Sequence, residues 1–426
     1  MKKIFSKSFG CQMNVYDSNR IVDIMKTEGY EDTQNIAEAD LIVINTCSIR
    51  EKAKEKVFSE IGRIDEVRKK DAILVIAGCV AQMASDEIKK RIKGADIVIG
   101  ATNYHKLPEM VRSGGGVKLD FLAKEKFNSL PQNRIIKGVS EFIAVQEGCD
   151  KFCSFCIVPF TRGREFSRNF SDIIDEAKNL ADNGVKEITL LGQNVDNYND
   201  NGKTLADLIF AINDIDGIKR IRYMTSYPTQ VGQDLIEAHA NVTKLMPFIH
   251  LPIQSGSNAV LKRMNRRYTA EQYLNVVENL RKARPDIAIS SDFIVGFAGE
   301  TDKDFDDTLE LCKQVKFSST FSFKYSIRPG TAGEKMKEQV DEKVKEERLR
   351  NLQNLLNDMQ LEYNKNFDGK EMEVLIESLS NREDGTYFGK SPYSQTIVCD
   401  KGAIGEIIRV KIDKVGMKLL EGKKLF

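Results

Sequence analysis

Short apolar runs alternate with amphipathic stretches along the first 112 residues of the chain. The runs DLIVINTC and AILVIAGC are flanked by helical patterns near 18–28 and 48–69, and a further helical pattern leads to the run DIVIG. Buried strands of this length that alternate with helices indicate a mostly parallel sheet. We therefore predict a small N-terminal α/β domain over residues 1–115.

The middle of the chain repeats a strand followed by a helical pattern six times. In the stretches SDIIDEAKNLADNG and DKDFDDTLELCKQV, apolar residues recur every three or four positions, as on one face of a helix. Six such units predict a partial (βα)6 barrel over residues 135–366, in which functional sites lie at the carboxyl ends of the strands. The candidate strands are 141–146, 186–191, 220–225, 247–251, 287–297 and 317–325.

The pattern changes again near Glu371. A charged helical pattern over 334–367 gives way to the short alternating runs EVLIES, SQTIVCD and EIIRVKI, which Gly and Asp separate. Such runs predict a small antiparallel β-barrel over residues 367–426. Between the first two domains, the polar stretch 113–138 opens with a serine and three glycines and is predicted to be a linker.

Charge and composition narrow the range of partners. The 426 residues include 64 Lys and Arg against 63 Asp and Glu, so no net field draws the chain to nucleic acid or to anionic lipid. No stretch reaches the roughly 18 apolar residues of a membrane span, and the N-terminus has no apolar signal segment. We expect a cytoplasmic protein without membrane contact, whose cysteines are thiols or metal ligands rather than disulfides.

Six of the eight cysteines fall into two groups of three. The dispersed triad consists of Cys11, Cys47 and Cys79, each of which ends a short apolar run. We therefore expect all three at the carboxyl tips of strands, along the edge where ligands collect in an open α/β sheet. Three thiolates are one short of a closed set of four ligands, which suggests an open metal site.

The compact triad consists of Cys149, Cys153 and Cys156 in the segment CDKFCSFC. Three thiolates on one short loop suit three corners of a cubic iron–sulfur cluster, and the fourth iron stays open to a ligand such as S-adenosylmethionine. Zinc would need a fourth ligand that no histidine offers nearby in sequence, and an odd number of cysteines cannot pair within itself. Two open clusters predict redox chemistry.

The segment CDKFCSFC resembles the cluster motif of the radical S-adenosylmethionine enzymes. With the flanking IVPFTRGRE and the segments GCQMNVYDS, NTCSIREKAKEKVF, AGCVAQ and HLPIQSGS, nearly the whole chain resembles the methylthiotransferases, and most of all those that act on isopentenyladenosine in tRNA. Their domain order is an N-terminal cluster domain, a radical barrel and a TRAM domain. In GFAGE this chain has Ala298 where the family usually has proline, a residue that mainly fixes the backbone.

The resemblance implies two 4Fe-4S clusters and S-adenosylmethionine as cofactors. The compact triad would hold the cluster that cleaves S-adenosylmethionine to a 5′-deoxyadenosyl radical, and the dispersed triad would hold an auxiliary cluster that carries the sulfur. The radical would remove hydrogen from C2 of N6-isopentenyladenosine at position 37, next to the anticodon, where a methylthio group is inserted. An aromatic C–H bond cannot be activated by ordinary acid or base catalysis. A radical cofactor must therefore supply the removal of the hydrogen.

The substrate expectation depends on the residues after the first cysteine. Gln12 and Met13 are typical of the family members that modify isopentenyladenosine, whereas relatives that act on threonylcarbamoyladenosine or on a ribosomal protein aspartate differ there. An alternative from another class is a non-catalytic iron–sulfur protein that binds RNA or transfers electrons. The expected partners are the tRNA anticodon stem-loop and an electron donor such as flavodoxin or ferredoxin, and we expect a monomer.

Further candidates surround the two triads. Residues at barrel strand tips and the aromatic residue before the last cysteine are candidates for the S-adenosylmethionine pocket, although glycine there fits a turn equally well. These candidates are Phe155, Gln193, Asn194, Asp292 and Gly296. We expect His250 to be packed and hydrogen-bonded, and Cys312 and Cys399 to be small buried residues.

Two groups of basic residues suggest a route for RNA. One group follows the compact triad, and the other lies in the segment LKRMNRRYT. On the active face they would grip phosphates on either side of a splayed base, whereas otherwise they form a solvated surface with acidic neighbours. The residues are Arg162, Arg164, Arg168, Lys262, Arg263, Arg266 and Arg267.

Overall fold

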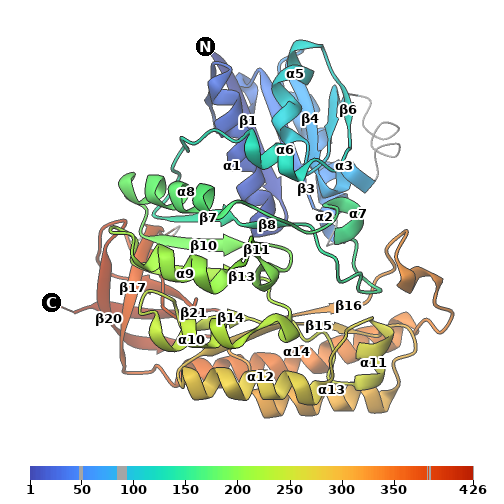
Figure 1. The fold of residues 1–426 in the computed structure, drawn as a ribbon, viewed down its shortest axis with the longest axis vertical. Helices are drawn as coiled ribbons and strands as arrows, with labels where there is room; N and C mark the ends of the chain where they lie inside the picture. The colour runs from blue at the N-terminus through green and yellow to red at the C-terminus, as the bar shows by residue number, and fades with distance from the viewer. Residues whose placement is uncertain (48–50, 84–93, 381, 383–384, 426) are drawn as a thin grey trace.

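The computed structural model describes residues 1–47, 51–83, 94–380, 382 and 385–425. Three parts follow one another along the chain: a six-stranded sheet, a partial barrel of two three-stranded sheets, and a closed five-stranded barrel (Figure 1). The α/β fold class expected from the sequence is confirmed. Among the described residues, no helix is both long and apolar enough to cross a lipid bilayer.

Every pair of neighbouring strands in the N-terminal sheet is parallel. Side chains along the third strand alternate between two cores: Leu41 and Val43 face one helical layer, and Ile42 and Ile44 face the other. Helices therefore cover both faces, which explains the nearly continuous apolar runs of the sequence. In sheet order the strands are β2 (Tyr30–Asp32), β1 (Lys2–Phe9), β3 (Leu41–Thr46), β4 (Ile73–Gly78), β5 (Ile97–Ile99) and β6 (Gly116–Lys118).

The helices of this part are α1 (Gln12–Thr27), α2 (Glu51–Val67), α3 (Cys79–Met83) and α5 (Leu107–Arg112). Two of the sequence expectations differ from the structure. Helix α1 begins directly after Cys11 rather than near Ser18, because Cys11 occupies the helix N-cap and the polar residues behind it are already helical. The stretch predicted as a linker contributes the edge strand β6 and the short helix α6 (Ala123–Asn128). The start of the predicted helix 48–69 falls at 48–50, outside the described residues.

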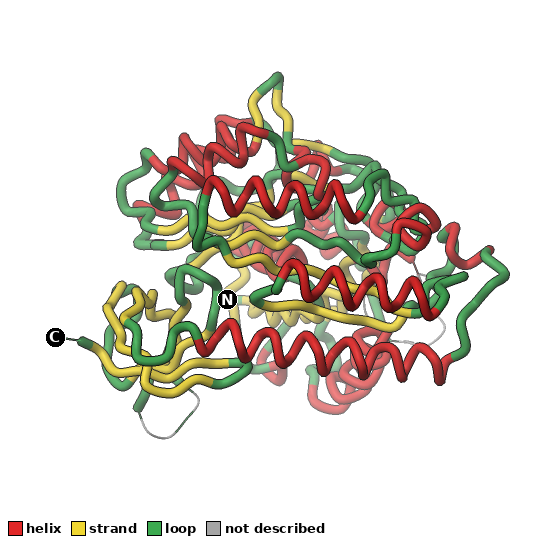
Figure 2. The backbone as a smooth tube through the Cα atoms, turned by 90° about the horizontal axis from the view of Figure 1, so that it is seen from below, coloured by secondary structure: helices red, strands yellow, loops and turns green. Residues whose placement is uncertain are grey.

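The partial barrel has six parallel strands, as the sequence predicted. Two three-stranded sheets meet at a bridge between Ile221 and Leu245, and one large apolar core fills the space between strands and helices. Figure 2 shows the helices lying alongside the strands. The strands are β7 (Ser140–Ala144), β10 (Glu187–Leu191), β13 (Arg220–Met224), β14 (Phe248–His250), β15 (Ala288–Val295) and β16 (Ser319–Lys324). The outer helices are α8 (Phe170–Asp182), α9 (Leu205–Asn213), α10 (Gln233–Asn241), α11 (Asn258–Arg263), α12 (Ala270–Ala283) and α13 (Asp302–Val315).

Helix α14 (Glu342–Lys365) packs along β16 and leads into the C-terminal barrel. This barrel was expected to be antiparallel, but β19 and β21 pair in parallel. The reason is geometric, because an odd number of strands cannot alternate in direction all the way around a closed ring. In ring order the strands are β17 (Glu371–Leu379), β18 (Tyr387–Lys390), β19 (Thr396–Cys399), β21 (Leu419–Lys424) and β20 (Ile407–Val415).

Two buried arginines of β13 bind the C-terminal barrel to the partial barrel. Arg220 donates to the carbonyl of Lys390 at 2.6 Å, and Arg222 donates to the carbonyls of Ser391 and Pro392 at 2.7 and 2.9 Å. Arg222 also forms an ion pair with the buried Glu187 at 3.0 Å. The backbone carbonyls of one domain are thus satisfied by side chains of the other, which fixes their relative position.

Arg222→Ala should therefore destabilise the chain strongly. The change leaves Glu187 without its cation and two buried carbonyls without their donor, and breaking a buried pair costs about 3–5 kcal/mol. The urea midpoint of unfolding measures the effect. Lys282→Ala is the matched control, because Lys282 and Glu278 form an exposed i,i+4 pair that contributes about 0.3–0.5 kcal/mol. Equal midpoints for the two variants would contradict the prediction.

Candidate active site

The compact triad lies in the loop that follows β7 and β8 (Gln146–Glu147). Gly148 has φ +79°, and a Cβ there would lie 2.0 Å from the carbonyl oxygen of Arg164, so this turn requires glycine. Phe152 also has a positive φ of 48°, and its carbonyl accepts a hydrogen bond from Nδ2 of Asn265 at 2.9 Å. These turns and this hydrogen bond fix the conformation of the loop.

The three thiols of the compact triad influence one another electrostatically. Burial raises the pKa of Cys149 and of Cys156 to about 12, and the neighbouring Cys153 contributes in the same direction. Backbone N–H groups of Lys151 and Val158 oppose the shift at Cys149 and Cys156 respectively. A metal that binds here must displace the thiol protons, so the site favours ions with a strong preference for sulfur.

The dispersed triad is assembled by three neighbouring strands of the N-terminal sheet. Cys11 caps α1 two residues after β1, Cys47 directly follows β3, and Cys79 begins α3 directly after β4. Glycine precedes two of the three cysteines. A Cβ on Gly10 would lie 2.5 Å from Cβ of Cys47, and one on Gly78, whose φ is +93°, would lie 2.3 Å from Oδ1 of Asn45. Side chains there would push the strand tips apart.

The thiol of Cys11 is strongly acidic. Its pKa is lowered to about 6, first by a hydrogen bond from the thiol of Cys47 and also by the positive charge of Arg162. The sulfur of Cys11 is 3.3 Å from Oδ1 of Asn14, whose backbone N–H also favours the thiolate. The N-terminus of α1 adds the positive end of a helix dipole.

Each triad offers three thiol groups, a soft donor set of the kind that iron–sulfur clusters use. No three His, Cys, Asp or Glu of the described residues are close enough to hold one metal ion, which argues against the zinc interpretation. The soft donor set and the shared electrostatics of each triad fit such a cluster.

A buried group of charged residues joins the elements that carry the two triads. Arg162, at the end of α7 (Val158–Thr161), donates to Asp17 of α1 at 2.8 Å and to Glu147 of β8 at 2.6 Å. Lys126 of α6 forms ion pairs with the same two carboxylates, and burial lowers its pKa to about 7. Helix α3 packs against α7 (Figure 1). We call Arg162, Asp17, Lys126 and Glu147 the interdomain network.

Two of the candidate pocket residues lie beside the compact-triad loop, and one of them, Gln193, contacts it. Oε1 of Gln193 accepts a hydrogen bond from the backbone of Gly148 at 2.5 Å. Oε1 of Gln146 accepts from the backbone of Gln193 at 2.9 Å and of Asn194 at 3.2 Å. Nδ2 of Asn194 donates to Glu165 at 2.9 Å. The tip of β10 therefore supports the loop, and its contact with S-adenosylmethionine stays a prediction.

The other three candidates lie in separate surroundings. Phe155 is partly buried between two apolar cores. Asp292 lies 3.5 Å from Nε2 of His250, whose Nδ1 is 3.1 Å from Ser290, so His250 is packed and hydrogen-bonded as expected. Gly296 has φ +70°, and a Cβ there would lie 2.3 Å from Cγ of Lys345 in α14. This glycine is covered by α14 and forms a tight turn.

The prediction of a basic RNA surface needs correction. Arg162, Arg168 and Arg266 are at most 9% exposed, and the first two form buried ion pairs with Asp17, Glu147 and Glu176. Among the other four, Arg164 pairs with Asp150 and Arg263 with Glu338, and Lys262 and Arg267 are exposed. Sequence alone cannot distinguish a buried arginine from a surface one when both lie close to the same motif.

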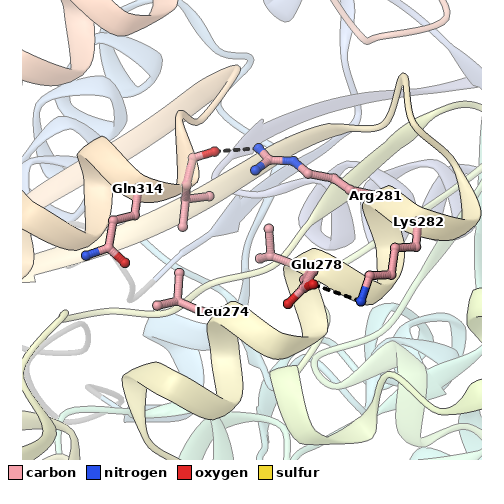
Figure 3. A pocket seen from close by; sticks show the side chains of 7 residues that line it. Leu274, Glu278, Arg281, Lys282 and Gln314 are labelled. Carbon is pink, nitrogen blue, oxygen red and sulfur yellow. Dashed lines mark hydrogen bonds and ion pairs between the residues drawn. The ribbon is translucent and has the colours of Figure 1, made fainter.

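Two grooves lie on the outside of the barrel, away from the triads. One is formed by α12 and the end of α13, where Arg281 donates to the carbonyl of Val315 and Lys282 pairs with Glu278 (Figure 3). The other lies between β16 and α14 and includes Phe321. Neither contains a cysteine.

The fold and the two triads define a radical S-adenosylmethionine protein with an additional cysteine-bearing domain. Family models match residues 143–312 to the radical SAM superfamily, 365–425 to the TRAM domain and 3–100 to the uncharacterized protein family UPF0004. Proteins named tRNA-2-methylthio-N(6)-dimethylallyladenosine synthase are 48% identical to the chain. The one from Rickettsia canadensis matches over 99% of both chains, and the one from Bartonella bacilliformis over 99% of this chain and 96% of its own. The chain belongs to this family.

Solved structures support the same fold. The radical S-adenosylmethionine methyltransferase TsrM from Kitasatospora setae, solved with cobalamin and a [4Fe-4S] cluster bound, is 15% identical. It matches with a TM-score of 0.60 over 78% of this chain and 77% of its own. The cobalamin-dependent radical enzyme OxsB matches with a TM-score of 0.52, at 12% identity, over 83% of this chain and 56% of its own.

Sequence reasoning missed several residues of the site. Asp17, Lys126 and Glu147 of the interdomain network come from three separate segments, and nothing in their local patterns connects them. The glycines before Cys11 and Cys79 were a usable signal, since Gly-Cys at the end of an apolar run indicates a tip that another backbone approaches closely.

Alkylation of the iron-free protein tests the different acidities of the thiols. The thiolate is the nucleophile, so Cys11 should react with iodoacetamide from about pH 6 upward, whereas Cys149 should react slowly up to about pH 8. Arg162→Met should move the Cys11 midpoint to higher pH, because the positive charge of Arg162 lowers this pKa. Peptide mapping by mass spectrometry measures each site, with the buried Cys312 as an unreactive control. Equal rates for Cys11 and Cys149 at neutral pH would refute the assignment.

Proposed function

We propose that the chain inserts a methylthio group at C2 of N6-isopentenyladenosine, at position 37 next to the anticodon of tRNA. Full-length relatives at 48% identity carry the name of this activity. The observation that carries the proposal is the arrangement of the two triads. Each offers three thiolates, and the interdomain network binds the elements that bear them to one another.

We assign the compact triad, Cys149, Cys153 and Cys156, to the 4Fe-4S cluster that exchanges with S-adenosylmethionine. The dispersed triad is assigned to an auxiliary 4Fe-4S cluster. When bound, these cofactors supply the radical chemistry and the sulfur. The residues of the chain hold the cysteines of both sites in place and exclude water from the interface between the two sites. They also fix the position of one triad relative to the other. Gln193 and Asn194 position the compact-triad loop in this scheme.

The substrate and the electron donor follow from the same proposal. We propose that the anticodon stem-loop binds with the isopentenylated adenosine directed to the strand tips of the barrel and with the RNA backbone in contact with the TRAM domain. A flavodoxin or ferredoxin would deliver electrons to the compact-triad cluster. We propose that the chain acts as a cytoplasmic monomer.

Replacing the triads separately should divide the reaction into its two parts. Changing Cys11, Cys47 and Cys79 to alanine should abolish methylthiolation but leave reductive cleavage of S-adenosylmethionine, because only the other cluster performs that step. Changing Cys149, Cys153 and Cys156 should abolish both. Liquid chromatography with mass spectrometry measures 5′-deoxyadenosine and the modified nucleoside after anaerobic reconstitution, with Cys399→Ala as a control outside both triads. Methylthio product from the first variant would contradict the proposal.

The substrate is tested in cells that lack the gene. Their tRNA should lose 2-methylthio-N6-isopentenyladenosine and accumulate N6-isopentenyladenosine, and the intact gene should restore the mark. Nucleoside mass spectrometry reads both. Loss of the threonylcarbamoyladenosine derivative instead, or loss of a methylthio group from a ribosomal protein aspartate with an unchanged tRNA profile, would assign the chain to one of the related activities. An unchanged profile of both would favour a non-catalytic iron–sulfur protein.

A further inference from the structure

Arg266 places its guanidinium against the compact triad. The residue is 9% exposed and lies just after α11, in the loop that leads to α12. One terminal nitrogen donates to Sγ of Cys153 at 3.4 Å, the other donates to the carbonyl of Pro252 at 2.9 Å, and Nε donates to the hydroxyl of Tyr268 at 2.7 Å. All three nitrogens of the guanidinium thus donate a hydrogen bond, and one of these bonds goes to a thiol.

Two aromatic rings keep the guanidinium in this orientation. Its central carbon is 4.3 Å from the ring centre of Tyr227 and 4.9 Å from that of Tyr268. The two rings meet edge to face at 5.3 Å, and the hydroxyl of Tyr268 also donates to the carbonyl of Ile253 at 3.1 Å. The position of the N–H that points to Cys153 is therefore fixed by packing.

Arg266 differs from the other buried arginines near the triads in the groups that surround its charge. Arg162 and Arg168 each form an ion pair with at least one carboxylate. In the described part of the chain, the groups in contact with the Arg266 guanidinium are Sγ of Cys153, the carbonyl of Pro252 and the side chains of Tyr227 and Tyr268, and none of these is a carboxylate. A buried charge is costly unless it is paired. Among these groups, only Cys153 belongs to the compact triad.

We propose that Arg266 is a positioning residue that sets the reduction potential of the cluster on the compact triad. The inference rests on the proposed function of that triad. Reduction adds one electron, and therefore negative charge, to the cluster. A buried cation with an N–H···S hydrogen bond to a ligand stabilises the reduced form and raises the potential. The sulfur of the compact triad that accepts the Arg266 hydrogen bond is Sγ of Cys153.

The test uses the full chain with Cys11, Cys47 and Cys79 changed to alanine, so that only one cluster assembles. A redox titration monitored by electron paramagnetic resonance, without tRNA, measures its midpoint potential. Arg266→Met should shift the potential to a more negative value, because it removes both the charge and the N–H donor. Arg266→Lys should give a smaller shift in the same direction, since lysine keeps the charge but not the planar fork. Iron content checks that each variant is loaded.

Arg267→Met is the matched control, because Arg267 is adjacent and exposed. Its potential should equal that of the parent. Unchanged potentials in loaded Arg266→Met and Arg266→Lys would overturn the inference, as would an equal shift in Arg267→Met, which would indicate only a general loss of positive charge. If Arg266→Met does not bind a cluster, the midpoint potential of Arg266→Lys tests the inference by the same criterion. A parent that shows no 4Fe-4S signal would instead contradict the proposed function, so the two failures are distinguishable.

Discussion

The interdomain network is the interaction on which the arrangement of the two triads depends. It places two cations and two carboxylates at a junction that is almost dry, where each of the four side chains is at most 2% exposed. Buried charges tolerate little displacement, because a lost partner leaves an unpaired charge that costs about 3–5 kcal/mol. The network therefore restricts how α1, α6 and the compact-triad loop move relative to one another, more strictly than apolar contacts alone would.

The two triads differ in what holds them together. The compact triad needs only a short loop with suitable turns, so it remains a local property of the sequence. The dispersed triad exists only after β1, β3 and β4 have paired, because more than thirty residues separate its successive cysteines. The glycines at positions 10 and 78 show how closely the tips approach. Folding of the N-terminal sheet must therefore precede assembly of a cluster on this triad.

The sequence predicted the architecture better than the surroundings of the site. The barrel strand β10, expected at 186–191 and observed at Glu187–Leu191, is a short, fully buried run that is mostly apolar. The start of α1 was predicted too late because the buried polar residues Asn14 and Asp17 interrupt the apolar pattern of its first turns. Buried arginines escaped prediction for a different reason: the partners of Arg162 lie on α1 and β8, and only the tertiary fold brings them together. The contacts of the pocket candidates with S-adenosylmethionine stay a prediction.

The two arginines beside the triads have different electrostatic consequences. The charge of Arg162 is shared with Asp17 and Glu147, and the same guanidinium lowers the pKa of Cys11 in the dispersed triad. Arg266 has tyrosines and a thiol around it, so much of its field acts on the compact triad. A protein with two clusters must favour electron entry at one of them. A buried cation that donates a hydrogen bond to a ligand sulfur of one triad is a physical means of making that distinction.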